Sequence, residues 1–368
     1  MVAGKKKEEK KVRQSGIELL RIVAMLMIIL HHLMLYSGAS MTTSPSTTSR
    51  DYFFSGISGF GRVGVGIFFM ITGYFLCASK KEPNPKRIAP IVKVSLFYLI
   101  ASIVLAFIII PDKMAITFPL AGLPLDFAQL YNNGFWWFIG AYILLMVFSP
   151  QIKKMLDALS DKELTRLCIV IAVMASVGTD CLRLLCVSDG FPNFVFPTAI
   201  TYALIGYTIK RREKSIKNCR LVIVALVTGV VLIMASPIVY TFFYNNNLGG
   251  LTDIFRREQA SGVMLTSIGC FILFLRMKWK NRVVNYIASF VLAVYLIHNN
   301  PFVLNITMWS SDNSIRSRLQ HVLHDKSFLH AIAVVAFYTV AIFVICCLIE
   351  LVRRSVLRLA IRAVARKK

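Results

Sequence analysis

Residues 17–36 read IELLRIVAMLMIILHHLMLY, and this apolar stretch decides the class of fold. A helix of this length covers about 30 Å, which is the thickness of the hydrocarbon core of a bilayer. The stretch nevertheless carries Glu18 and Arg21 near its start, and His31 and His32 near its end. Ionisable side chains are costly to bury in lipid, so those of a membrane-spanning helix are candidates for function.

Helical spacing distinguishes the two histidines. Arg21 and His32 point within about 20° of each other and lie about 16 Å apart along the axis, whereas His31 points about 80° away from Arg21. Two interpretations remain open. Either Arg21 extends to the membrane interface and His32 bonds a neighbouring carbonyl group, or both side chains line one site.

The composition is that of an integral membrane protein. The chain has 368 residues, 57% of them hydrophobic, and a mean hydropathy of +0.66. Most of the eight cysteines lie in apolar runs, with no CxxC pair and no His/Cys ligand spacing. This pattern favours small core residues over a disulfide scaffold or a metal site. The sequence predicts an all-α polytopic bundle with a basic tail over 1–16, a transmembrane domain over 17–351 and a second basic tail over 352–368.

About ten membrane spans are expected from the alternation of apolar runs and polar breaks. They cover 17–37, 57–79, 91–110, 135–150, 167–187, 192–209, 221–243, 260–275, 286–303 and 329–351.

The distribution of basic residues gives the orientation. With ten spans and a cytoplasmic start, the cytoplasmic segments hold 31 of the 42 Lys and Arg residues, and the opposite loops hold seven. Because basic residues favour the cytoplasmic side, both termini are expected there. The net charge of +24 is then a signal of topology and of attraction to anionic membrane lipid. Nucleic-acid binding is not needed to explain it.

The second apolar run, 59–76, reads GFGRVGVGIFFMITGYFL. It contains GxGxxG, but the strand and acidic residue of a dinucleotide-binding unit are missing. We expect Gly61, Gly64 and Gly66 to allow close helix packing instead. Arg62, at the start of this span, either reaches the membrane surface or points into the bundle.

These segments are similar, in order, to those of membrane-bound acyltransferase family 3. The resemblance rests on GIELLRIVAMLMIILHH with Glu18, Arg21 and His32; on GRVGVGIFFMITGYFL with Phe68-Phe69, Thr72 and Gly73-Tyr74; on KRIAPIVKVSLFY with Lys86, Arg87 and Lys93; on WWFIGAYILLMVFSP; and on VYLIH, residues 294–298.

The resemblance implies transfer of an acyl group, usually acetyl from acetyl-CoA, to a hydroxyl of a cell-envelope glycan or lipid-linked sugar. Acyl-CoA would be a donor substrate rather than a permanently bound cofactor, and the bacterial plasma membrane is the expected location. His32 is the expected general base, because histidine titrates near neutral pH. Arg21 is expected to bind the phosphates of coenzyme A, with Glu18 fixing its rotamer. No GxSxG motif offers a serine nucleophile.

The predicted site has three groups: His32 as catalytic residue; Arg21, Glu18, Arg87 and Lys93 for the donor; and Arg62, Tyr74, Tyr295 and His298 for the acceptor. His298 has a second interpretation as a cap of its helix at Asn299-Asn300-Pro301. Asp180 and Arg183 are expected to form a structural pair, and Arg256, Arg257, His321 and His324 to be solvated charges.

A membrane carrier for a small polar molecule is the alternative function. Buried arginine and histidine serve ligand binding or proton coupling equally well. The sequence shows no broken-helix pair and no inverted repeat of the kind that many transporters have, which lowers the weight of this alternative.

Overall fold

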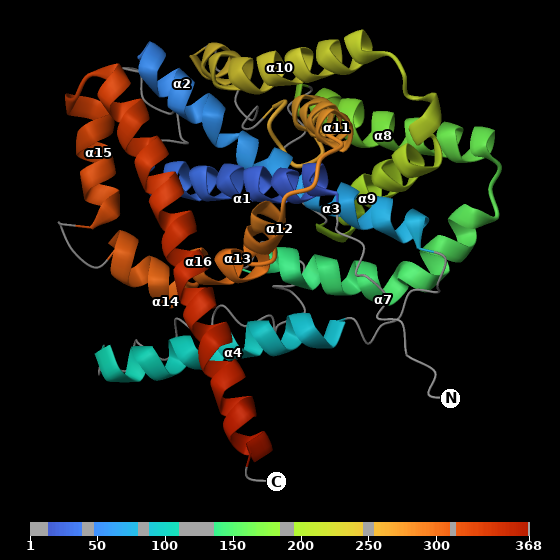
Figure 1. Cartoon of the computed structure of the whole chain (residues 1–368). Coiled ribbons are helices and arrows are strands. Elements are labelled where there is room, and N and C mark those ends of the chain that lie inside the picture. The colour runs from blue at the N-terminus through green and yellow to red at the C-terminus, as the bar shows by residue number, and fades with distance from the viewer. Residues whose placement is uncertain are drawn as a thin grey trace, which may run out of the picture.

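The computed structural model describes residues 14–38, 48–79, 88–109, 136–184, 195–245, 254–309 and 314–366, and this part of the chain contains helices and no strand. The elements, in chain order (Figure 1), are α1 (Ser15–Tyr36), α2 (Ser49–Ser58), α3 (Phe60–Ala78), α4 (Ile88–Ile109), α7 (Trp137–Asp157), α8 (Asp161–Leu184), α9 (Val195–Arg211), the 3-10 helix η2 (Glu213–Ser215), α10 (Cys219–Asn245), α11 (Ser261–Leu275), α12 (Arg282–Ala288), α13 (Val291–His298), α14 (Pro301–Leu304), the π-helix η3 (Asn305–Trp309), α15 (Ile315–Asp325) and α16 (Phe328–Arg366).

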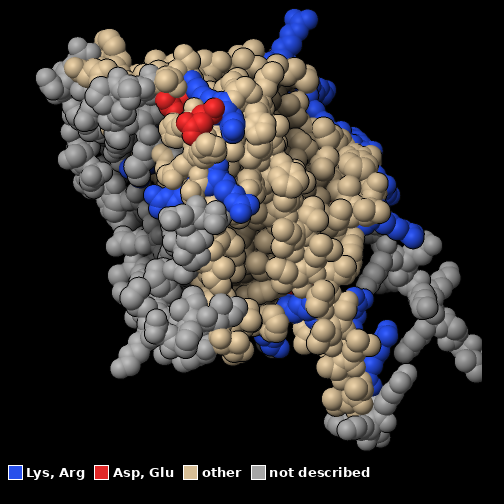
Figure 2. All heavy atoms as spheres, turned by 90° about the vertical axis from the view of Figure 1, so that its left-hand side faces the viewer, with Lys and Arg blue, Asp and Glu red and all other residues tan. Residues whose placement is uncertain are grey.

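Seven helices of the described ranges are long and apolar enough to cross a membrane. Each of the ten predicted spans overlaps a helix, but α9 and α11 are shorter, and the segment of α12, α13 and α14 is bent. The count of ten therefore stays a prediction. Large apolar side chains such as Met174, Phe337 and Ile108 are exposed, as expected for a surface that faces lipid. In Figure 2 a broad part of the described surface carries no charged side chain, and Lys and Arg lie around its edges.

The centre of the bundle is built around α1 and α3 (Figure 1). The glycines of α3 allow close approach, as predicted. A Cβ on Gly64 would lie 2.5 Å from the carbonyl oxygen of Ala24, one on Gly61 would collide with His31, and one on Gly66 would lie 2.7 Å from the Tyr202 ring. Small residues replace side-chain packing with backbone contact between helices.

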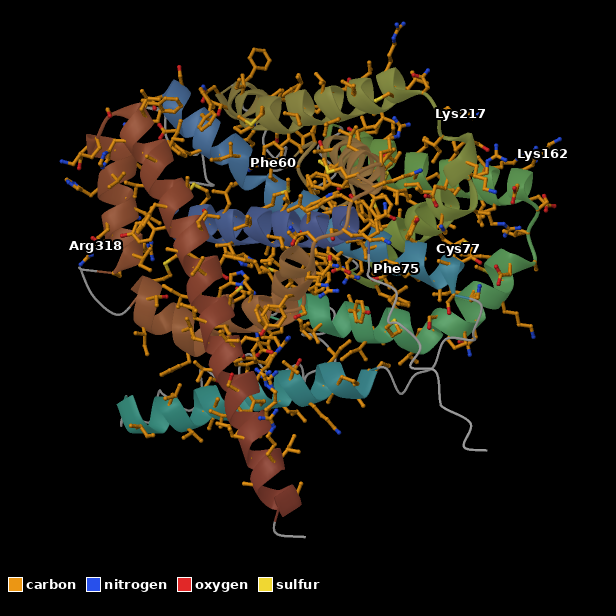
Figure 3. All side chains as sticks on the ribbon, viewed as in Figure 1. Phe60, Phe75, Cys77, Lys162, Lys217 and Arg318 are labelled. Atoms are coloured by element: carbon orange, nitrogen blue, oxygen red, sulfur yellow. The ribbon has the colours of Figure 1, made fainter. Side chains whose placement is uncertain are left out.

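Contacts between distant segments gather at two ends of the bundle. One end joins segments that the sequence places in the cytoplasm: Ser15 N to Trp279 O at 3.0 Å and Arg211 Nε to Asp161 Oδ1 at 3.0 Å. The opposite end joins the other loops: Gln320 Nε2 to Ser37 O at 3.0 Å and Arg50 Nη2 to Val322 O at 2.8 Å. In Figure 3, Cys77, Lys162 and Lys217 lie at the first end, and Arg318 lies at the second. Which end faces the cytoplasm stays a prediction.

Two segments differ from the sequence analysis. The bend between 282–298 and 302–308 is 67°, so the chain contains a broken helix that the apolar pattern did not indicate. It falls at Pro301, which cannot donate the hydrogen bond that a continuous helix needs there. In addition, residues 352–366 of the predicted tail continue α16 as helix.

Candidate active site

The centre of the site is a pair of histidines from α1 and α13. His32 Nδ1 lies 3.0 Å from His298 Nε2, and the ring centroids are 5.1 Å apart. The sequence places these residues 266 positions apart, and packing of α13 on α1 brings them together. His32 thus has its partner on a different helix.

The hydrogen bonds of His298 fix which nitrogen of His32 is available. His298 Nδ1 lies 2.7 Å from the carbonyl oxygen of Val294. Since a carbonyl only accepts, this nitrogen carries the hydrogen, and Nε2 of a neutral His298 has the lone pair. His32 Nδ1 must then donate to His298, which leaves the lone pair of His32 on Nε2. This is the tautomer that a general base needs. The bond to Val294 agrees with the interpretation of His298 as a residue that bonds the end of its own helix, whereas its role in binding the acceptor stays a prediction.

Tyr36 and Asn299 extend this pair and were missed by the sequence analysis. The Tyr36 ring stacks on His32 with centroids 5.6 Å apart, and its hydroxyl donates to Asn299 Oδ1 at 2.7 Å. Tyr36 is one helical turn after His32, and Asn299 follows His298. These spacings could have indicated that Tyr36 and Asn299 lie beside the two histidines. They do so only once α1 and α13 are known to be neighbours.

Arg21 lies near the beginning of α1, whereas the two histidines lie near its end. Its Nη1 is 3.1 Å from Glu18 Oε2, which confirms the predicted pair, and its guanidinium lies 5.8 Å from the centre of the Phe75 ring. Arg21 borders a cavity of about 270 Å³, here called the arginine cavity, whose wall includes Tyr142 and Tyr295. The side chain of Arg21 is 27% exposed and that of Glu18 is almost buried. Arg21 is therefore accessible from the arginine cavity, and Glu18 supports it from behind.

A second cavity of about 190 Å³, here called the histidine cavity, is lined by His32, His298 and Tyr36. Tyr295 borders the arginine cavity, and its ring lies 6.0 Å from that of His298, between centroids. The two cavities therefore follow each other along α1 and α13. A larger cavity of about 420 Å³ lies between α4 and α16 and includes none of the predicted site residues.

His31 has a different environment from His32. Its Nδ1 is 2.6 Å from the carbonyl oxygen of Ser58, and its side chain fills the space beside Gly61. His31 therefore ties α1 to the α2–α3 junction. His32 as the catalytic residue stays a prediction.

Arg62 belongs to a separate polar cluster at the beginning of α3. Its Nη1 donates to the carbonyl oxygen of Arg256 at 2.8 Å, and its Nε lies 3.3 Å from Glu258 Oε1. Arg256 is buried and donates to the carbonyl oxygen of Ser55 at 2.6 Å. The expectation that Arg256 is a solvated charge is wrong, because the loop before α11 folds back onto α2. No hydrogen bond described here joins this cluster to His32.

The remaining predicted site residues lie elsewhere. Tyr74 donates to Glu213 Oε2 at 3.0 Å and is on the far part of α3 from His31 and Gly61. Lys93 is exposed on α4, near Ile91 of the arginine cavity. Arg87 lies outside the described residues. Of the predicted site residues, Arg21, Tyr295, His32 and His298 line the two cavities, and Glu18 is paired with Arg21. Neither Arg62 nor Tyr74 lines them.

Two expectations about charged side chains have different outcomes. Asp180 is buried, and its carboxylate accepts from the backbone nitrogens of Phe255 at 3.2 Å and Ser261 at 3.0 Å. It thus anchors the loop before α11, while the side chain of Arg183 lies outside the described residues. His321 is well exposed and pairs with Asp325, as a solvated group would.

Comparison with known protein families identifies the class of reaction. A family model described as an acyltransferase domain, acyltransferase family 3, matches residues 14–351. The chain belongs to acyltransferase family 3. No curated protein and no solved structure matches it. The match covers α1 to α16 up to Leu351, and so includes both cavities and every described residue of the predicted site. Together with its apolar helices, it makes this acyltransferase a multi-pass membrane protein.

Proposed function

We propose that this acyltransferase moves an acyl group from acyl-CoA to a hydroxyl of a cell-envelope glycan or lipid-linked sugar at the bacterial plasma membrane. One observation carries the proposal: His32, held by His298, borders a cavity on the same helix as Arg21. A base for the acceptor and a cation for the donor are thereby fixed on one rigid element.

One side chain, His32, serves first as general base and then as general acid in the proposed reaction. His32 Nε2 takes the proton of the acceptor hydroxyl as its oxygen attacks the thioester carbonyl carbon. A carbon–oxygen bond forms, the carbon–sulfur bond breaks, and the departing thiolate of coenzyme A takes the proton back from Nε2. His298 accepts the hydrogen bond from His32 Nδ1 throughout and stabilises the imidazolium that forms. A base in this position contributes about 10²- to 10⁴-fold in rate.

Arg21 supplies the donor end of the site. Its planar guanidinium binds phosphate oxygens in pairs, which suits the phosphates of coenzyme A. Glu18 holds the rotamer of Arg21 from 3.1 Å away. Arg21 and His32 are about 16 Å apart along α1, a gap that the pantetheine arm of the donor would cross. Lys93, exposed on α4, and Arg87 are further proposed contacts of the nucleotide.

The test uses purified protein in proteoliposomes, radiolabelled acyl-CoA and a pool of envelope glycans. Wild type is compared with His32→Ala and Arg21→Ala, and His31→Ala is the matched control because it removes the adjacent histidine. Label is expected to reach the glycan with wild type and His31→Ala, and to be lost with His32→Ala. Undiminished transfer by folded His32→Ala would contradict the proposal.

The carrier remains the second candidate, because the bend of 67° after α13 places a broken helix beside His298. Broken helices commonly form transport sites. If wild type releases no coenzyme A with any donor, uptake of labelled metabolites into the same proteoliposomes is the measurement to make. Uptake that depends on His298 would then favour the carrier.

A further inference from the structure

The wall of the histidine cavity is hydrocarbon. Apart from His32, His298, Tyr36 and Thr307, it consists of aliphatic and sulfur-containing side chains from α1, α13 to α16 and η3, among them Ile29, Met308, Ile342 and Cys346. Such a wall attracts apolar groups and excludes polar ones that it cannot hydrogen-bond.

The polar side chains of this wall already have hydrogen-bond partners. Tyr36 donates to Asn299 at 2.7 Å, and Thr307 Oγ1 donates to the carbonyl oxygen of Val303 at 2.7 Å. The two histidines bond each other through Nδ1 of His32, and Nε2 of His32 is the atom assigned above to one hydroxyl of the acceptor. A sugar ring that entered the cavity would give up hydrogen bonds to water without replacing them, which is unfavourable for each hydroxyl. The glycan acceptor therefore does not fit the interior of this cavity.

The size of the cavity selects among apolar occupants. Its volume is about 190 Å³. An apolar cavity of about 150 Å³ in another protein takes up benzene, a molecule of six carbons. The single methyl group of an acetyl donor would leave most of the histidine cavity empty, and the surrounding side chains would lose their packing contacts.

The position of the cavity identifies which part of the substrates reaches it. A donor with its phosphates at Arg21 and its pantetheine arm laid along α1 past Tyr295 would bring its thioester to His32, because both residues lie on α1 and line successive cavities. The carbon chain beyond the thioester carbonyl would then enter the histidine cavity, most of whose α1 wall lies at or beyond His32.

We propose that the histidine cavity holds the hydrocarbon chain of the transferred acyl group, and that the preferred donors are acyl-CoA thioesters of about four to six carbons. This inference rests on the proposed function and specifies its donor. The cavity would then limit the length of the chain, and its wall includes Ile342 and Cys346 of α16.

The experiment measures kcat/KM for straight-chain acyl-CoA donors from acetyl to octanoyl, with the glycan pool as acceptor. Each methylene buried in the cavity is expected to raise kcat/KM by roughly fourfold until the cavity is full. Butanoyl-CoA, which has two more methylenes, should therefore exceed acetyl-CoA by roughly sixteenfold. Octanoyl-CoA should fall below hexanoyl-CoA because its chain is too long.

Neighbouring cysteines provide a matched pair of variants. Cys346 lines the cavity, whereas Cys347 is half-buried and is not part of its wall. Cys346→Phe should lower the ratio of hexanoyl to acetyl kcat/KM by about tenfold or more, and Cys347→Phe should keep the wild-type ratio. Ile342→Ala, which enlarges the cavity, should move the optimum towards longer chains, and it serves if Cys346→Phe does not fold.

The outcomes separate the inference from the proposed function. Transfer of acetyl alone, with a chain-length profile that neither Cys346→Phe nor Ile342→Ala changes, overturns the inference and leaves the acyltransferase intact. No transfer from any donor overturns the proposed function. A third result, in which the variants change the KM of a lipid-linked acceptor but not the donor preference, would assign the cavity to the acceptor lipid and also overturn the inference.

Discussion

Helix α1 has two sides with opposite packing. Where it meets the first half of α3, glycines bring the backbones into contact, and a Cβ on Gly64 would lie 2.5 Å from the carbonyl oxygen of Ala24. On the side that faces α13 and α16, the same helix borders the histidine cavity. His31 belongs to the first side and His32 to the second.

The difference shows how one helix combines rigidity with a reaction space. A general base must stay within a fraction of an ångström of its productive position, and this requires a tightly packed support. Close backbone contact with α3 leaves α1 little freedom to shift, because packed interiors transmit strain rather than absorb it. Space for substrate can then open on the other side. Substitutions on the two sides of α1 should therefore have different effects: on the packed side they should lower stability, and on the cavity side they should lower activity.

The largest effect is expected from Gly64→Leu. Its side chain would meet the main chain of Ala24, which cannot rotate away, so α1 and α3 would have to separate. Overpacking of this kind costs about 1–3 kcal/mol or more. We expect a large loss of folded protein, measured by size-exclusion chromatography in detergent and by thermal unfolding.

Gly178→Leu in α8 is the control for this substitution, because a Cβ at Gly178 has no neighbour within 4 Å. It should fold as well as wild type, since leucine favours a helix over glycine by roughly 0.8 kcal/mol. If both variants lost the same amount of folded protein, the close contact between α1 and α3 would not be the cause of the loss.

His298→Ala is the next largest change and tests the other side. His32 Nδ1 donates its hydrogen to His298. Without this acceptor, the tautomer and the orientation of the His32 ring are no longer fixed. We expect kcat to fall by about 10²-fold, which is more than the modest loss of stability from truncating this buried side chain would cause in folded protein. Steady-state kinetics with a saturating donor measure this.

His31→Ala should give the opposite result. It removes the bond to the Ser58 carbonyl and leaves a void beside Gly61, so it should lower stability by about 1–3 kcal/mol and change kcat by only a few-fold. If His31→Ala impaired kcat more than His298→Ala did, the assignment of the two sides would be reversed.

The sequence predicted those features that depend on one helix alone. The all-helical class, the pairing of Glu18 with Arg21, and the shared face of Arg21 and His32 follow from apolar runs and from 100° per residue. The glycines of α3 were also predicted to pack closely, because the run offers small residues at short intervals.

Features that depend on long-range packing were not predictable. The bond of His32 to His298 requires the position of α13, and the burial of Arg256 requires the fold of its loop over Ser55. Loop charges are usually solvated, and the exception is created by neighbours that no local pattern reveals. Tyr74 belongs to the Gly73-Tyr74 step of the family resemblance. Its hydroxyl nevertheless donates to Glu213 of η2, a residue far along the chain that no local pattern connects with it.

Arg21→Lys tests the donor end with a smaller expected effect. Lysine keeps the charge next to Glu18 but loses the paired geometry for phosphate. The KM for acyl-CoA should rise about tenfold, whereas kcat should change little. An acyl-pantetheine donor, which lacks the nucleotide, should be used equally well by wild type and Arg21→Lys. A similar defect with both donors would remove Arg21 from phosphate binding.

Tyr36→Phe has the smallest expected effect and tests the border of the histidine cavity. The ring that stacks on His32 remains, but buried Asn299 loses the donor 2.7 Å from its Oδ1. An unsatisfied buried acceptor costs about 1 kcal/mol or more, and part of that loss should appear as disorder of the adjacent His298. We expect kcat to fall about three- to fivefold. In a double-mutant cycle, Tyr36→Phe should cause little further loss of kcat in an Asn299→Ala background, because the hydrogen bond between these two side chains is already absent there. Additive losses would mean that Tyr36 acts on His32 through its ring alone.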